Sequence, residues 1–154
     1  MKPMKVPGAD HPIVIEPSTS RIRVTVAGRV IADTRAALTL RESDYLAVLY
    51  VPRADVAMSL LVRTDNHTYC PYKGEASYYS IAGGDQRTAN AAWTYEAPYD
   101  AVKSIEGYLA FYPDRVDAIE ELPLDSLPGR FCVQLLHVRL YRLEQLGLAA
   151  RPSP

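Results

Sequence analysis

The stretch Arg21-Ile-Arg-Val-Thr-Val-Ala27 decides the fold class. Its isoleucine and two valines alternate with two arginines and a threonine, which is the period of a strand with one buried face. Gly28 interrupts this pattern and Val30-Ile-Ala32 resumes it. We therefore expect a β-hairpin here.

Further strands are expected toward the C-terminus. Leu46–Val51 is a β-prone run that Pro52 stops, typical of a strand buried on both faces. Asp55 is placed to cap a short helix, and Pro98–Ile105 suits a turn or short helix. Many short strands with few helices predict a mainly β, single-domain roll, barrel or sandwich. The remaining strand candidates are Ser77–Ile81, Ala91–Tyr95 and Tyr108–Tyr112.

The two ends of the chain differ from this central part. The first 17 residues hold prolines at positions 3, 7, 12 and 17, which predicts an extended arm rather than a helix. Between Arg130 and Leu148, apolar residues recur at spacings of three and four, which predicts an amphipathic helix. We expect an N-terminal extension at 1–10 and a mostly-β domain at 11–121. Residues 122–154 are expected to form a linker, the appended C-terminal helix and a disordered tail.

Composition excludes several classes of protein. The chain has 154 residues, 48% of them apolar and 23% charged, which fits one globular domain. Its net charge of −1 argues against a broadly basic nucleic-acid or membrane binder. There is no apolar run near the ~20 residues of a membrane span, and no apolar segment typical of a signal peptide follows the N-terminal lysines. With two cysteines, this favours a soluble protein of the reducing cytoplasm.

Tyrosine is concentrated in one part of the sequence. The chain has 11 tyrosines, and eight of them fall between positions 69 and 112. Strand geometry places Trp93 and Tyr95 on one face of their strand. If the strands are neighbours, we expect Tyr78, Trp93, Tyr95 and Tyr112 to form the wall of a pocket for a small molecule. The alternative is that tyrosine simply suits half-buried strand surfaces.

Cys70 and Lys73 are the candidate catalytic residues in this region. Cys70 is a possible nucleophile or redox thiol whose pKa Lys73 would lower, and Lys73 suits an anionic ligand or a Schiff base. The alternatives are a buried thiol filling a turn and a surface ion pair of Lys73 with Glu75 or another acid. His67 and Cys70 alone do not make a metal site, so we predict neither a metal nor a cofactor.

Several motifs occur in a fixed order along the chain, from His11 to Tyr112. They are His11–Ile13, Val30–Thr34, Glu42, Tyr50–Asp55, Cys70–Tyr79, Ala92–Tyr95 and Tyr108–Tyr112. This set, spanning about residues 11–120, resembles domain of unknown function (DUF) family 427, which is sometimes labelled nucleotidyltransferase-like. The resemblance implies a mostly-β fold similar to the β-tent (Mss-four-like) group, which includes B-type methionine sulfoxide reductases and the thalidomide-binding domain of cereblon.

The chain lacks one feature of those relatives and two features that the nucleotidyltransferase label would require. It lacks the paired Cys-x-x-Cys knuckles that hold a structural zinc in many of them. It also lacks a Gly-x-x-x-x-Gly-Lys loop and any Asp-x-Asp pair, which nucleotidyl transfer would require. Glu42 joins the ligand-binding candidates. One alternative is that the fold gathers it with Asp33 and Asp55, and the other is that each acid is a cap or a surface charge.

Three functional hypotheses follow. The first is a binding domain with a small-molecule ligand in the aromatic pocket, and the second is an enzyme that uses Cys70 or Lys73 there. The third is an interaction module that forms a homo-oligomer through the C-terminal helix. Neither nucleic acid nor membrane is an expected partner.

Overall fold

The computed structural model describes residues 2–124 and the backbone of Arg139–Leu140. It confirms the mainly β fold class. The strands are β1 (Ile13–Pro17), β2 (Ser20–Val26), β3 (Arg29–Thr34), β4 (Leu38–Glu42), β5 (Val48–Tyr50), β6 (Leu61–Cys70), β7 (Gly74–Ile81), β8 (Ala92–Thr94), β9 (Leu109–Phe111), β10 (Ala118–Pro123) and β11 (Arg139–Leu140). The short 3₁₀ helices are η1 (Arg53–Asp55), η2 (Met58–Leu60), η3 (Gln86–Thr88) and η4 (Asp100–Ile105).

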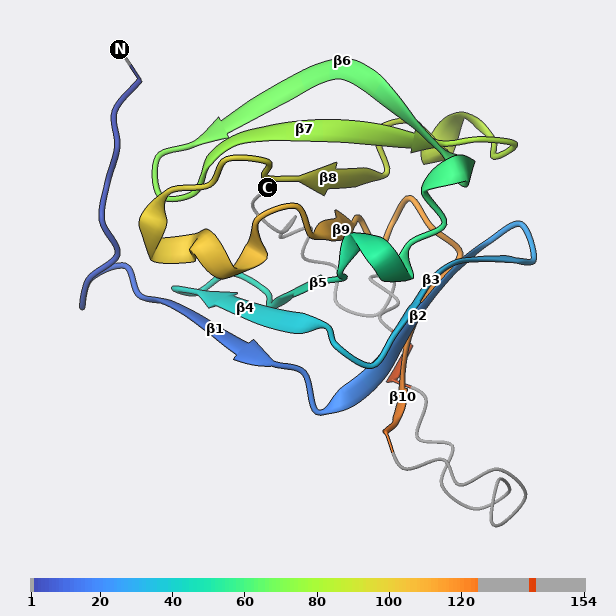
Figure 1. The fold of residues 1–154 in the computed structure, drawn as a ribbon, viewed down its shortest axis with the longest axis horizontal. Helices are drawn as coiled ribbons and strands as arrows, with labels where there is room; N and C mark the ends of the chain where they lie inside the picture. The colour runs from blue at the N-terminus through green and yellow to red at the C-terminus, as the bar shows by residue number, and fades with distance from the viewer. Residues whose placement is uncertain (1, 125–138, 141–154) are drawn as a thin grey trace.

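The strands form three antiparallel sheets, with strand orders β1-β4-β5, β11-β10-β2-β3 and β6-β7-β8-β9. Figure 1 shows the sheets arranged around a common interior, with η4 and the N-terminal segment at one end. Val51 and Leu109 exchange two backbone hydrogen bonds of 2.7 and 2.8 Å. These bonds join the end of β5 to β9 and so hold the first sheet against the third.

The expected hairpin is confirmed as β2 and β3. Ile22, Val24 and Val26 are buried, whereas the residues between them are only partly covered. Gly28 has a φ of +74° in the connecting turn, a conformation that glycine adopts without strain. Alternation in the sequence therefore predicted both the strand and its buried face.

Other elements differ from their predictions. Asp55 does not cap a helix over the following residues: it closes η1, and its Oδ2 accepts a 2.7 Å hydrogen bond from the Thr34 hydroxyl. The strand expected at Leu46–Val51 is shortened to β5, and Leu46 is exposed. The strands β1, β4, β6 and β10 were not predicted. Apolar and polar residues do not alternate regularly over the full length of these strands because the strands are only partly buried. Much of β6, for example, is open to solvent.

The C-terminal prediction is tested at two residues only. Arg139 and Leu140 pair as β11 with Glu121 and Glu120 of β10, so this part of the predicted helix is a strand. The rest of that helix and the tail lie outside the described residues. β10 itself extends to Pro123 and pairs along β2.

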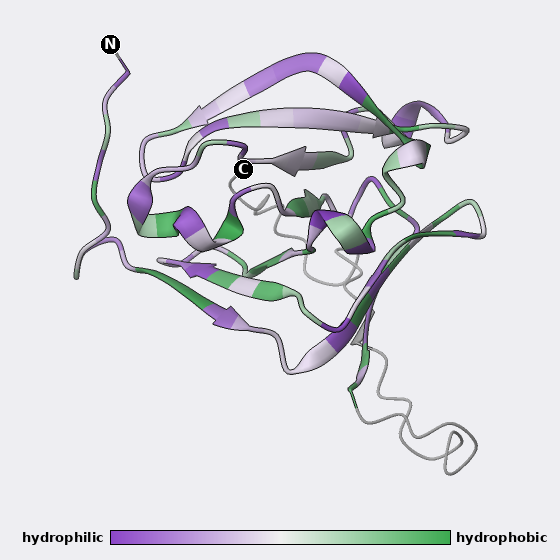
Figure 2. Cartoon of the chain, viewed as in Figure 1, coloured by the Kyte–Doolittle hydropathy of each residue, from purple (hydrophilic) through white to green (hydrophobic). Residues whose placement is uncertain are grey.

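The interior holds two clusters of buried side chains. We call the first the apolar cluster; it includes Ile22, Val24, Val26, Ile31, Ala32, Val51, Ala92, Leu109, Phe111, Val116 and Ile119. The second contains Tyr50, Tyr78, Trp93, Tyr95 and Tyr112, which we call the aromatic cluster. In Figure 2 the strands β7 and β8 have mostly pale, intermediate colours. Three rings of the aromatic cluster come from this part of the chain: Tyr78 lies in β7, Trp93 lies in β8 and Tyr95 directly follows β8.

Candidate functional site

Lys73 lies in the tight turn between β6 and β7. Its backbone N–H donates to the Cys70 carbonyl at 3.2 Å, and its own carbonyl accepts from the Tyr99 N–H at 3.0 Å. Gly74 follows with a φ of +110°, which favours glycine because other side chains are strained there. The turn carries Lys73 into the interior, where its exposure is 0%.

The Lys73 ammonium group forms a buried ion pair with Glu42 at the end of β4. Nζ lies 2.5 Å from Glu42 Oε1, and the Glu42 side chain is 4% exposed. The surface pair with Glu75 that was considered for Lys73 is therefore wrong. Glu75 instead lies 3.3 Å from Lys2 and 3.4 Å from His67, in an exposed group.

His11 continues this pair toward the surface. Its Nε2 lies 2.8 Å from Glu42 Oε2, and its side chain is 21% exposed. The imidazole stacks on the Tyr72 ring with centroids 3.9 Å apart and planes 7° from parallel. The three polar groups thus form a continuous chain from a partly exposed histidine to a fully buried amine. No spacing rule in the sequence linked His11 to this site; its presence in one of the ordered motifs was the only signal.

The N-terminal segment lies across the β6–β7 turn (Figure 1). The Lys5 N–H donates to the Pro71 carbonyl at 2.8 Å, and the Tyr69 hydroxyl donates to the Pro3 carbonyl at 2.6 Å. Residues 2–6 are themselves exposed and have no regular secondary structure. Lys2 also pairs with Glu75 at 3.3 Å, so the segment lies against the outside of the turn through contacts at the surface.

The four tyrosine and tryptophan residues predicted as pocket walls do come together. Trp93 is the cross-strand partner of Tyr78, and its ring centroid lies 4.5 Å from that of Tyr112. The hydroxyls of Tyr78 and Tyr112 are 3.3 Å apart. Tyr50 was missed as a member; it receives a 3.4 Å hydrogen bond from Trp93 Nε1. All five rings are at least nine-tenths buried, so in this state they form a closed core rather than an open pocket.

The Tyr95 hydroxyl is buried and has no hydrogen-bond partner among the described residues. Burial raises the pKa of Tyr95 well above its usual value, and the neighbouring Tyr50, Cys70, Tyr78 and Glu42 raise it further. Burial likewise raises the pKa of Tyr50, with Glu42 and Cys70 adding to the effect. Both tyrosines are therefore neutral at physiological pH. Glu42 is buried on the same face of β4 as Leu40, and Leu40 packs in one buried cluster with these rings, so the aromatic cluster adjoins the Lys73–Glu42 pair.

Cys70, Asp33 and Asp55 are not partners of the Lys73 amine. Cys70 ends β6 and is 6% exposed, while the Lys73 amine is directed to Glu42. Asp33 pairs with Arg21 and Asp55 with Thr34, so of the two alternatives for Asp33, Glu42 and Asp55, separate partners and not a shared site describe these acids. Residues 2–124 contain no group of three or more metal-ligating side chains placed to hold an ion.

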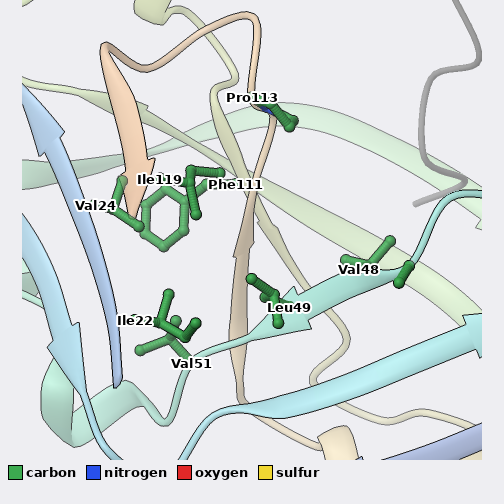
Figure 3. A pocket seen from close by; sticks show the side chains of 9 residues that line it. Ile22, Val24, Val48, Leu49, Val51, Phe111, Pro113 and Ile119 are labelled. Carbon is green, nitrogen blue, oxygen red and sulfur yellow. The ribbon is translucent and has the colours of Figure 1, made fainter. Parts of the chain in front are cut away.

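A separate hollow lies beside the apolar cluster, between β2, β5, β9 and β10. Figure 3 shows Phe111 and Ile119 turned toward Val24 at one part of it. None of the residues predicted as pocket walls lines it. The lining is apolar and consists of Ile22, Val24, Ala47, Val48, Leu49, Val51, Phe111, Pro113 and Ile119. The hollow and the polar site are thus different places in the molecule.

Comparison with known proteins assigns a family. Within the described residues, no helix has the length and apolar character needed to cross a membrane. No curated protein sequence matches the chain. The sequence profile of a family described as a domain of unknown function, DUF427, matches residues 14–122. This match covers more than half of the 154 residues, and the chain belongs to the DUF427 family.

Proposed function

We propose that this protein binds a small molecule where the Lys73–Glu42 pair meets the aromatic cluster. The observation that carries the proposal is the fully buried Lys73 ammonium, whose pairing with Glu42 adjoins the cluster that contains the unpartnered Tyr95 hydroxyl. Burying an ion pair contributes little to stability because desolvation offsets the attraction. A fold that keeps such a pair together with an unsatisfied hydroxyl has a functional reason for both.

The aromatic cluster supplies the second part of a binding site. Trp93 and Tyr112 offer flat faces and lie next to each other. Small-molecule sites combine apolar and aromatic walls with a few convergent polar groups. The described arrangement has both parts.

A ligand reaches these groups by moving the N-terminal segment or the rings. The segment is the easier part to displace because residues 2–6 are exposed and their ion pair and hydrogen bonds with the β6–β7 hairpin lie at the surface. Regions with few buried contacts open at the lowest free-energy cost. His11, at the partly exposed end of the polar chain, marks the point of entry.

Native mass spectrometry on protein isolated from cells without denaturation tests the proposal. We expect the wild type to retain a compound that is released on unfolding, Trp93→Ala to retain none, and Lys73→Met to retain much less. Lys103→Met is the matched control, since that lysine is 59% exposed in its side chain and lies outside the site. Equal retention by Lys73→Met and the wild type would contradict the proposed site.

A second candidate function is catalysis by the Lys73 amine. The observation that favours it is the chain from His11 through Glu42 to Lys73, which offers a route for a proton between solvent and the buried amine. An amine activated in this way condenses with an aldehyde to an imine and water. Benzaldehyde with cyanoborohydride should then label Lys73 faster than Lys2, Lys5 or Lys103, as located by peptide mass spectrometry. Preferential labelling of the three other lysines would rule this function out.

A further inference from the structure

The buried Lys73 ammonium has more hydrogen-bond donors than the protein satisfies. A lysine ammonium carries three N–H groups, and among the described residues Glu42 Oε1 is the partner of Nζ. The other carboxylate oxygen, Oε2, is occupied by His11. Both oxygens of the Glu42 carboxylate therefore have a protein partner already, while the ammonium keeps donors to give.

Two buried hydroxyls add to this surplus. The Tyr95 hydroxyl has no partner within the described part of the chain. The Tyr50 oxygen accepts the Trp93 N–H at 3.4 Å, which leaves its own proton to be donated. Since buried donors without acceptors are costly, the missing element at this site is an acceptor. An ammonium group on a ligand carries donors and no acceptor, so it would not supply it.

The charge of the site restricts the acceptor further. Lys73 and Glu42 carry opposite charges at 0% and 4% exposure, so the pair is neutral as a whole. A carboxylate ligand would bring an uncompensated charge into a buried place beside Glu42, and such a charge is unfavourable there. A neutral carbonyl oxygen accepts two hydrogen bonds, donates none and adds no charge.

We propose that the site takes a small neutral molecule whose carbonyl oxygen accepts hydrogen bonds from Lys73 Nζ and the Tyr95 hydroxyl. Its flat or apolar part packs against Trp93 and Tyr112. This inference rests on the proposed binding function and adds the chemical class of the ligand. It assigns the Tyr95 hydroxyl as a hydrogen-bond donor to the ligand, whereas the sequence predicted only that the Tyr95 ring forms part of the pocket wall.

The indole N–H of Trp93 gives a direct reading of occupancy, because the chain has one tryptophan and its Nε1 contacts Tyr50 inside the cluster. We would titrate ¹⁵N-labelled protein with benzamide, benzoate and benzylamine, which share a ring and differ in their polar group. We expect benzamide to shift the indole signal with a Kd at least about tenfold below those of the two charged probes.

Two tyrosine variants separate the donor role from ring packing. Tyr95→Phe removes the unpartnered hydroxyl and keeps the ring, so we expect benzamide affinity to fall about fivefold or more. Tyr79→Phe is the matched control: this neighbouring β7 tyrosine is also buried but belongs to the apolar cluster. Its variant should bind benzamide as the wild type does. Unchanged affinity in Tyr95→Phe would overturn the assignment of the hydroxyl.

The possible outcomes distinguish this inference from the proposed function. If benzoate or benzylamine binds most tightly with a shift at Trp93, the carbonyl class is wrong and the binding site stands. If none of the probes shifts the indole signal while native mass spectrometry finds a retained compound that depends on Lys73, the class is again wrong and the site stands. If the probes have no effect and no compound is retained, both proposals fail.

Discussion

The two buried clusters are equally shielded from solvent and differ in their chemistry. The apolar cluster packs side chains such as Ile22 and Ile31, both 0% exposed. The aromatic cluster adjoins Lys73, also 0% exposed, and Glu42. Burying an aliphatic side chain stabilises a fold by roughly 1.5–3 kcal/mol, whereas a buried ion pair is weak evidence for stability. The first cluster therefore accounts for stability, and the polar groups beside the second need another explanation.

The largest effect is expected from breaking the buried pair on one side. Glu42→Gln keeps the shape of the side chain and removes its charge, so the Lys73 ammonium is left buried without a counter-ion. We expect the free energy of unfolding to fall by about 3–5 kcal/mol, measured by urea denaturation at pH 7. A loss below about 1 kcal/mol would show that Lys73 is not charged and paired in the folded protein.

A truncation in the apolar cluster is expected to have a comparable but purely structural effect. Ile31→Ala removes a fully buried side chain and should cost about 3 kcal/mol in the same urea experiment. Ligand retention and the Trp93 indole signal should stay as in the wild type once the variant is folded. A change at Trp93 as large as that in Lys73→Met would show that the two clusters are coupled.

Replacing both members of the buried pair is expected to have a smaller effect on stability. Glu42→Leu with Lys73→Met removes two buried charges together, and such exchanges are commonly neutral or stabilising by about 1–4 kcal/mol. We expect a free energy of unfolding at or above that of the wild type, combined with loss of the retained compound. A strongly destabilised double variant would indicate that the pair is there for stability, which would contradict its proposed role in binding.

The contrast between the clusters also explains what the sequence could reveal. Alternation within a strand sets which face each side chain takes, so the β2–β3 hairpin and the common face of Trp93 and Tyr95 followed from local spacing. Tyr50 belongs to the same cluster but comes from a run that was read as buried on both faces. Its direction was therefore not fixed by the pattern.

The polar site depends on contacts that no local rule contains. Glu42 and Lys73 are 31 residues apart, and so are His11 and Glu42. Their meeting requires the end of β4 to face the β6–β7 turn, which follows from how the first and third sheets pack. The sequence therefore yielded Lys73 and Glu42 as separate candidates, and only the fold made them a pair.

The smallest effect is expected at an ion pair on the surface, which completes the comparison with Lys73–Glu42. Arg21 and Asp33 lie on β2 and β3 with two hydrogen bonds of 2.7 Å, yet their side chains are 25% and 31% exposed. We expect Asp33→Asn to cost less than about 1 kcal/mol at pH 7, because water and salt screen such pairs. A cost equal to that of Glu42→Gln would mean that burial does not distinguish the two pairs.

The pH dependence of this surface pair gives an internal check. Hydrogen bonding to Arg21 holds the pKa of Asp33 below its usual 3.8. A carboxyl group whose pKa is lowered by folding contributes stability above its unfolded pKa and loses that contribution as the pH falls through the folded value. The difference in unfolding free energy between the wild type and Asp33→Asn should therefore be constant from pH 5 to 7 and shrink below about pH 4. A difference that persisted at pH 2 would show that packing of the side chain, and not its charge, stabilises this end of the β2–β3 hairpin.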